Sequence, residues 1–308
     1  MLRWLGLRIA GGVFVLWAVA TLIFFALRLI PGDPAQAILG GPGSQASPEA
    51  LAQVRLDYGL DQPLAAQYFG ALGRLLRGDL GTSYALKTDV GALILDQFWG
   101  TLVLTLAALA AAWIFALGLA LWTTRGGWLS DRVGSGMEIM AAAVPHFWLA
   151  SVFIIVFSSW LGWLPAISVP GPIGLVLPVL TLAIPLAGFL GQVMRESLAD
   201  ALESPFALSA RARGESETGV RWYHGIRHAA LPGISLSGWA FGALLSGAVV
   251  VETVFARPGL GRTLLNAVTI RDIPVVTGVA LVSALAFILV TVVTDLVDRI
   301  ADPRLGTS

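Results

Sequence analysis

Six long apolar runs divide this chain, and they constrain its fold more than any other feature of the sequence. They lie at residues 9–30, 98–124, 137–160, 175–194, 234–254 and 275–297. A helix of about 20 residues crosses the hydrocarbon core of a bilayer, and it satisfies all of its own backbone hydrogen bonds there. The pattern therefore predicts an all-α polytopic membrane protein with six transmembrane helices.

The composition agrees with this fold class and excludes several functions. Hydrophobic residues make up 56% of the chain, charged residues 12%, and the mean hydropathy is +0.81, all outside the soluble globular range. The net charge of zero gives no indication of nucleic-acid binding, and we expect none. The absence of cysteine excludes disulfides and thiolate metal sites. We expect the chain to bind neither a metal nor any other cofactor.

The first apolar run follows two basic residues, Arg3 and Arg8, which is also the charge order of a signal peptide. A signal peptide has a shorter apolar core that ends in a small-residue cleavage site. We therefore predict a retained first transmembrane helix over 1–30, which starts in the cytoplasm and crosses the lipid bilayer. The sequence Pro31-Gly32-Asp33-Pro34 cannot continue a helix and ends it.

Residues 31–97 are mixed in polarity and are predicted to form an extracytoplasmic segment with short amphipathic helices. Ser47 and Pro48 are typical of an N-cap and first helical position, and that helix is expected to run through Tyr58. A second helix is expected over 63–76, followed by a turn at 78–81. Lys87 lies six residues after Gly81, but Leu86 occupies the position of the second P-loop glycine, so no ATP site is predicted there.

Arginine placement predicts the orientation in the membrane. With alternating spans, eleven arginines fall on the side of the N-terminus and three fall in the two short opposite loops. Positive residues concentrate on the cytoplasmic side, so both termini are predicted to be cytoplasmic. The eleven are Arg3, Arg8, Arg125, Arg132, Arg195, Arg211, Arg213, Arg221, Arg227, Arg299 and Arg304; the three are Arg257, Arg262 and Arg271.

The most polar stretch between two apolar runs is 209–232, inside the predicted loop 195–233. This charge must lie in water. The pattern predicts two short helices hinged at Gly214, with Trp222, Tyr223 and Ile226 on the apolar side of the second. The stretch is expected to close at Leu231-Pro232.

Ala-Arg-Ala-Arg-Gly at 210–214, followed by His-x-x-Arg-x-Ala-x-Leu-Pro at 224–232, resembles the coupling loop of ABC-importer permeases of the dipeptide/oligopeptide family. The resemblance covers nearly the whole chain. Thr291 and Asp298 depart from it, standing where the family usually has Asn and Tyr near Asp295. Further matches are Pro-Gly-Asp-Pro at 31–34, Gly-Leu-Asp-Gln-Pro at 59–63, Gln-Tyr at 67–68, Gly-Asp-Leu-Gly at 78–81, Pro-Gly-Leu-Gly-Arg at 258–262, Arg-Asp-x-Pro at 271–274 and Asp-Pro-Arg at 302–304.

The resemblance implies a type I importer permease fold, with a five-helix core domain over 98–308. It implies a bacterial inner-membrane subunit that works with a second homologous permease, two cytoplasmic ATPases that hydrolyse Mg-ATP, and an extracytoplasmic solute-binding protein. We expect Ala210, Arg211, Ala212, Arg213 and Gly214 to dock on an ATPase; the alternative is that the two arginines contact anionic lipid head groups. The residues expected to face the binding protein are Asp33, Asp79, Pro258, Gly259, Gly261 and Arg262.

An ionisable residue inside a span is a candidate for the translocation pathway, and His146 lies in the third apolar run. Pro145 is expected to kink that helix. Phe147 and Trp148 match the family pattern and His146 does not; a neutral histidine bonded to a neighbouring helix is the alternative. Glu138 and Asp295 are expected at the membrane interfaces, and Pro178 with Pro185 to kink the fourth span.

The sequence leaves the solute open among di- or oligopeptides, nickel or metal chelates, glutathione and opines. A self-sufficient secondary carrier would show inverted repeats with paired broken helices, and no such repeat is seen. An intramembrane enzyme would need a motif such as His-Glu-x-x-His or paired midplane acids, and neither occurs. We therefore expect a transport subunit without its own ATPase site, coupled through the 209–232 loop.

Overall fold

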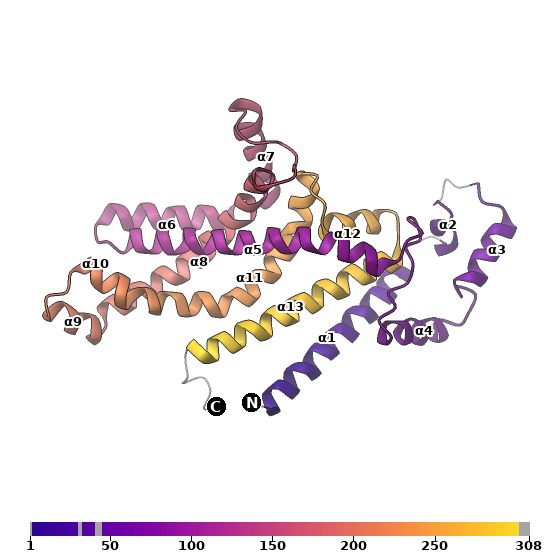
Figure 1. Ribbon diagram of the computed structural model, residues 1–308, viewed down its shortest axis with the longest axis horizontal. Helices are drawn as coiled ribbons and strands as arrows, with labels where there is room; N and C mark the ends of the chain where they lie inside the picture. The colour runs from indigo at the N-terminus through magenta and orange to yellow at the C-terminus, as the bar shows by residue number, and fades with distance from the viewer. Residues whose placement is uncertain (1, 30–32, 41–44, 302–308) are drawn as a thin grey trace. The chain divides into compact units, whose positions relative to one another are not determined.

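The computed structural model describes residues 2–29, 33–40 and 45–301 (Figure 1). Within these residues the regular elements are helices, and the pairing of Thr82 with Asp89 is an isolated bridge. The chain forms two compact units. The first comprises Met1–Gly100 and Pro258–Ile288; the second comprises Thr101–Arg257 and Leu289–Ser308. Helices α5 (Val90–Thr123) and α13 (Ile273–Ala301) contribute to both.

The first unit is built on two long apolar helices that lie side by side, α1 (Leu2–Leu29) and the first part of α13 (Figure 1). A Cβ atom at Gly12 would lie 3.1 Å from the Ile288 side chain, so the two backbones approach closely. The core joins the start of α5, α12 (Leu260–Thr269) and α13. It contains Val90, Ile94, Leu260, Ala267, Val275, Val276 and Val279.

Short helices carry the segment between α1 and α5, as the sequence predicts. They are α2 (Pro34–Ile38), α3 (Pro48–Asp57) and α4 (Leu64–Leu76). Ser47 Oγ accepts a hydrogen bond of 3.2 Å from the Ala50 N–H, which confirms the predicted N-cap. Gly78 and Gly81 adopt left-handed φ angles of 76° and 82° in the predicted turn. Of the matched motifs, Pro31-Gly32 and 302–304 lie outside the described residues.

One expectation for the first unit was wrong. The region after Pro258 is largely helical, because α12 places Leu260 and Ala267 against the core while Gly259 serves as its N-cap residue. A loop was expected there because the stretch is too short and too polar to be recognised as a span.

The second unit packs around α8 (Val176–Glu203), which contacts α6 (Trp128–Ala143), α7 (His146–Phe153) and α11 (Ile226–Val254). Gly188 of α8 allows a very close approach, since a Cβ atom there would lie 2.5 Å from the backbone of α6. This unit also contains a π-helix at Ile154–Trp160 and a 3₁₀ helix at Pro172–Leu175.

The kink predicted at Pro145 in the third span is a full break in the helix. Helices α6 and α7 meet at an angle of 103°, so five helices in the described chain are long and apolar enough to cross a membrane, or six if this pair counts as one span. The break lies at Val144, whose ψ of 124° is extended because it precedes Pro145. Helix α6 begins at Trp128, nine residues before the third apolar run, and covers most of the residues between the second and third runs.

Other boundaries differ from the predicted spans because hydropathy does not mark where a helix ends. Helix α5 starts at Val90, eight residues before the apolar run, and α8 extends to Glu203. Pro178 lies in the first turn of α8, where its missing N–H breaks no hydrogen bond, so only Pro185 is an interior proline. Pro232 lies inside α11, so the polar stretch does not close there.

Candidate coupling segment and transport elements

The coupling segment, residues 205–225, follows α8 and consists of two short helices joined by a turn. The first is α9 (Pro205–Ala212); the second is α10 (Glu217–Gly219), which continues into a π-helix at Val220–Gly225 and then into α11. Gly214 has a φ of 87°, which favours glycine. Ser216 Oγ accepts a hydrogen bond from the Gly219 N–H at 3.1 Å and caps the second helix. The hinge predicted at Gly214 is confirmed.

Arg211 fixes the geometry of this turn. Its Nε donates to Glu217 Oε1 at 2.7 Å and its Nη2 donates to Glu217 Oε2 at 3.1 Å. Its Nη1 donates to the Leu202 carbonyl at 2.8 Å, near the C-terminus of α8. One guanidinium thus ties α8, α9 and α10 together, in the fork geometry that arginine alone provides.

The five residues expected to dock on an ATPase differ in exposure. Ala210 is fully buried and Arg211 is engaged within the chain, whereas Ala212, Arg213 and Gly214 are exposed. Three side chains of the segment, Ala207, Ala210 and Val220, are fully buried in the core cluster that also contains residues of α8.

Trp222 and Tyr223, predicted on the apolar side of the second helix, are 58% and 81% exposed and do not pack against α8. The π-helical turn shifts the helical phase, so Val220 and Gly225 face inward instead. A Cβ atom at Gly225 would lie 2.5 Å from Leu198 of α8, which shows how closely this turn packs.

Aromatic and polar contacts also join the first helix of the segment and the turn to the second helix and to α11. His224 Nε2 lies 3.0 Å from Glu215 Oε2, next to the hinge. The Phe206 ring stacks on His228, with centroids 4.8 Å apart. Ser197 Oγ of α8 donates to the His228 carbonyl at 2.9 Å. The two helices of the segment are therefore linked to each other and to both neighbouring long helices.

Glu138 joins α6 to α8. Its side chain is fully buried and accepts a hydrogen bond of 2.9 Å from Arg195 Nε. The residue lies between packed helices, where a carboxylate needs a paired cation, and its position at a membrane interface stays a prediction. Only the partner on α8, 57 positions away, explains the burial.

His146, Phe147 and Trp148 begin α7 directly after the break at Pro145. His146 is half-buried, and a Cβ atom at Gly247 of α11 would lie 3.5 Å from its ring. Phe147 and Trp148 are 61% and 52% exposed. The break thus brings the imidazole against α11 and leaves the two aromatic rings outside the packed core of this unit.

All six residues expected to face a binding protein lie in the first unit. Asp33 accepts from Arg55 Nη2 at 2.6 Å and from the Ala35 N–H at 2.9 Å. Burial acts to raise the pKa of Asp33, but these bonds outweigh it and hold the pKa below its ordinary value. Asp79 Oδ1 accepts from the Gly81 N–H at 2.8 Å. Pro258 and Gly259 precede α12, Gly261 is buried, and Arg262 is partly exposed.

The role of Asp272 was missed. Its carboxylate is 2% exposed and accepts from Ser83 Oγ at 2.5 Å and from the backbone N–H groups of Tyr84 and Ala85, both at 3.1 Å. This clamp ties the loop before α5 to the start of α13, across 189 positions. An Arg-Asp-x-Pro match in the sequence marks the residue but not its partner.

Glu252 was missed as well. It is fully buried near the end of α11 and accepts a 2.5 Å hydrogen bond from Thr101 Oγ of α5. An acid at the end of an apolar run gives no signal of its partner, because the threonine is 151 positions away.

Two family descriptions match the chain. Residues 112–307 match the family described as binding-protein-dependent transport system inner membrane component, and residues 1–105 match the N-terminal region described for such membrane components. The chain is 38% identical over 307 residues to the glutathione transport system permease protein GsiC of Salmonella choleraesuis, covering 99% of each chain. It is 36% identical to the protein of that name from Escherichia coli K12, with the same coverage.

Solved structures show the fold. A chain of the inward-facing MetNI methionine ABC transporter matches with a TM-score of 0.55 and 18% identity, over 68% of this chain and 96% of that one. A chain of an amino acid ABC transporter with histidines matches with a TM-score of 0.54 and 19% identity, over 68% and 94%.

Proposed function

Because this chain belongs to the family of binding-protein-dependent transport system inner membrane components, we propose that it forms half of the translocation pathway of an importer for short peptides, with glutathione the first solute to test. The chain is the permease subunit of an ABC importer and a multi-pass protein of the bacterial inner membrane. The ATPase is a separate subunit, and a binding protein delivers the solute. We infer that the second permease is a homologue and that two ATPases complete the complex.

The choice of solute is based on the similarity of the whole chain to glutathione permeases. The match to glutathione permeases covers 99% of the chain, including the extracytoplasmic segment. Di- and oligopeptides share the peptide bonds and terminal charges of glutathione. Nickel, metal chelates and opines are the competing solutes, and they serve as comparison substrates in the uptake assay.

The coupling segment is proposed to transmit ATPase closure to α8 and α11. Ala212, Arg213 and Gly214 would meet the ATPase, together with the exposed Leu208 and Tyr223. Arg211 would act as a brace rather than as a contact, because all three of its bonds lie within the chain. A braced helical turn between two long helices moves as a rigid body, which is how such transitions spread.

The broken span is proposed to line the pathway. His146 lies against α11, while Phe147 and Trp148 leave a large apolar surface that a second permease would cover. Contact with the solute would then come from the start of α7, near the break at Pro145.

The test is uptake by the complete complex in proteoliposomes. Purified permeases, ATPases and binding protein are reconstituted, and ATP-dependent accumulation of radiolabelled glutathione, a dipeptide and nickel is compared. Accumulation of the peptides supports the proposal; accumulation of nickel alone, or uptake by this chain without ATP, overturns it.

The docking role has its own matched pair of variants. Arg213→Glu is expected to abolish solute-stimulated ATP hydrolysis, while Arg125→Glu, an exposed arginine in the turn after α5, leaves it unchanged. If Arg213→Glu acts only in liposomes with anionic lipid and not in neutral ones, the arginine serves the lipid surface instead.

A further inference from the structure

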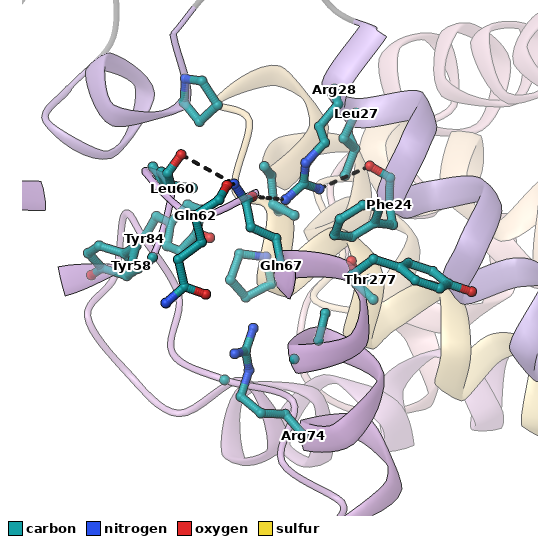
Figure 2. Close-up of a pocket in the computed structure, with 18 of the residues that line it drawn as sticks. Phe24, Leu27, Arg28, Tyr58, Leu60, Gln62, Gln67, Arg74, Tyr84 and Thr277 are labelled. Carbon is teal, nitrogen blue, oxygen red and sulfur yellow. Dashed lines mark hydrogen bonds between the residues drawn. The ribbon is translucent and has the colours of Figure 1, made fainter. Parts of the chain in front are cut away.

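We propose that the first unit contains a binding site for the carboxylate of a small peptide-like solute, with Arg74 and Arg28 supplying the positive charge. The choice of a peptide-like solute rests on the proposed function. The site lies among α1, the region from α3 to α4, the loop before α5 and the start of α13 (Figure 2). By the predicted topology this site lies on the extracytoplasmic side of the membrane.

The cavity has the size of a small-molecule site. Its volume is about 770 Å³, within the range of about 300 to 1,000 Å³ usual for such pockets. Tyr58 and Tyr84 form one wall, edge to face, with ring centroids 5.1 Å apart. Tyrosine rings provide an apolar surface with a polar tip, which suits a peptide backbone.

Arg28, near the end of α1, has no anionic partner in the described chain. Its Nη1 donates to the Phe24 carbonyl at 3.1 Å and its Nη2 to Gln67 Oε1 at 2.7 Å, and the guanidinium lies 3.5 Å from the Phe24 ring centroid. Figure 2 shows both bonds. A guanidinium has five N–H donors, and among the described residues none of those of Arg28 meets a carboxylate within 4 Å.

The orientation of Gln67 is fixed by its own contacts. Its Nε2 donates to the Leu60 carbonyl at 3.2 Å and to the Gln62 carbonyl at 2.8 Å. The amide oxygen therefore has to face Arg28. This holds the guanidinium at the cavity while leaving its charge uncompensated, an arrangement that an incoming anion stabilises.

Arg74 of α4 supplies the second charge. Figure 2 shows its side chain extending from the helix toward Gln62. Its guanidinium has no hydrogen bond or ion pair with any residue in the described ranges.

The nearby carboxylates are already engaged. Asp33 is paired with Arg55 at 2.6 Å, Asp57 accepts from Gln53 at 2.8 Å, and Asp79 accepts from the Gly81 N–H at 2.8 Å. Asp57 and Asp79 keep their charge, because their hydrogen-bond donors are neutral, but neither lies within 4 Å of Arg28 or Arg74. Each of these two guanidinium groups can therefore still bind a carboxylate through paired N–H···O bonds.

The experiment measures solute binding to the complete complex in lipid nanodiscs, without binding protein. Saturation-transfer NMR gives dissociation constants for glutathione, trialanine and trialanine amide, the last being the same peptide without its carboxylate. The variants are Arg74→Gln and Arg28→Gln. Arg77→Gln is the matched control, since Arg77 follows α4, is exposed and lies outside the cavity.

We expect Arg74→Gln to weaken trialanine binding about tenfold or more, as for a lost charge-assisted hydrogen bond, and Arg77→Gln to have no effect. The amide should bind about tenfold more weakly than the acid to the wild type and equally weakly to Arg74→Gln. Because Arg74 is exposed, Arg74→Gln is expected to fold normally, and thermal unfolding of this variant checks that it does. The test therefore stands on Arg74→Gln even if Arg28→Gln misfolds.

Equal affinity for the acid and the amide would overturn the site. So would equal weakening of trialanine binding by Arg74→Gln and by the control Arg77→Gln, because the effect would then not depend on the cavity. If the wild type accumulates peptide in proteoliposomes but Arg74→Gln binds as the wild type does, the site fails and the proposed function stands. If the wild type accumulates no peptide, the proposed function itself fails.

Discussion

Arg211 and Glu217 form a two-point ion pair across the Gly214 turn, with Nε–Oε1 and Nη2–Oε2 distances of 2.7 and 3.1 Å. The two side chains are 30% and 56% exposed, so the pair alone adds little stability. Its importance is geometric, because the same guanidinium also holds the Leu202 carbonyl of α8.

The first prediction is that Arg211→Lys uncouples ATP hydrolysis from transport more than it destabilises the protein. Lysine keeps the charge but cannot make the forked pair and the carbonyl bond together. Uptake per ATP should fall severalfold, while the thermal midpoint changes by only a few degrees, because exposed pairs contribute about 1 kcal/mol or less. Arg125→Lys is the control, and equal coupling in both variants would contradict the prediction.

The second prediction concerns the backbone at Gly214. No atom lies within 4 Å of the position that a Cβ atom would occupy there, so a substitution acts through the φ of 87° rather than through crowding. Gly214→Val should cost about 1 to 2 kcal/mol locally and impair coupling, and Gly214→Asn should be milder, because asparagine tolerates the left-handed region. Gly136→Ala in α6, also without neighbours within 4 Å, should be neutral in ATPase and uptake assays.

The third prediction tests the Asp272 clamp through the single lysine of the chain, Lys87, which is exposed in the clamped loop. Asp272→Asn places an amide N–H₂ against donors, and loss of bonds to a buried charge costs about 1.5 to 3 kcal/mol. Cleavage by a lysine-specific protease after Lys87 should become several times faster. The exposed Asp96→Asn should cleave at the wild-type rate; unchanged cleavage in Asp272→Asn would show that the clamp does not hold this loop.

The fourth prediction concerns alkaline pH. Burial, with a smaller contribution from Tyr58, raises the pKa of Tyr84 to about 12. A raised pKa favours the neutral form in the folded state. Its contribution to stability is therefore full below about pH 10, the unfolded value, and is lost as the pH rises to about 12.

Ultraviolet titration of tyrosinate should show a step near pH 12 that Tyr84→Phe removes. Arg74 lowers this pKa by its charge, so Arg74→Gln should move the step upward, whereas Arg77→Gln should not. A titration of Tyr84→Phe that retains the step would assign it to another residue.

The fifth prediction concerns the contact of α8 with α6. A Cβ atom at Gly188 would lie 2.5 Å from both the Glu138 carbonyl oxygen and the Ala142 nitrogen, and backbone cannot move aside as a side chain can. Gly188→Ala should therefore destabilise the protein by about 1 to 3 kcal/mol and lower its thermal midpoint in detergent. Gly136→Ala in α6 is the control. If Gly188→Ala has the same thermal midpoint as the wild type, α6 can move away to make room for the added methyl group, and the prediction is wrong.

Local chemistry explains why much of the secondary structure follows from the sequence alone. The apolar runs predict the long helices because lipid forces each span to satisfy its own backbone. Ser47 with Pro48 predicts the start of α3, and Gly214 predicts the hinge, since both effects act within a few residues. The motif matches identify the family for the same reason, because they are short and contiguous.

Only the tertiary structure decides how the side chains are used. The sequence expects Arg211 to face a partner, yet α8 and α10 supply its acceptors. It also gives no sign that Arg195 of α8 compensates the buried Glu138, or that Ser83 lies against Asp272. Periodicity and hydropathy report on a residue's own helix, whereas charge compensation and packing in a low-dielectric interior depend on whichever helix folds against it.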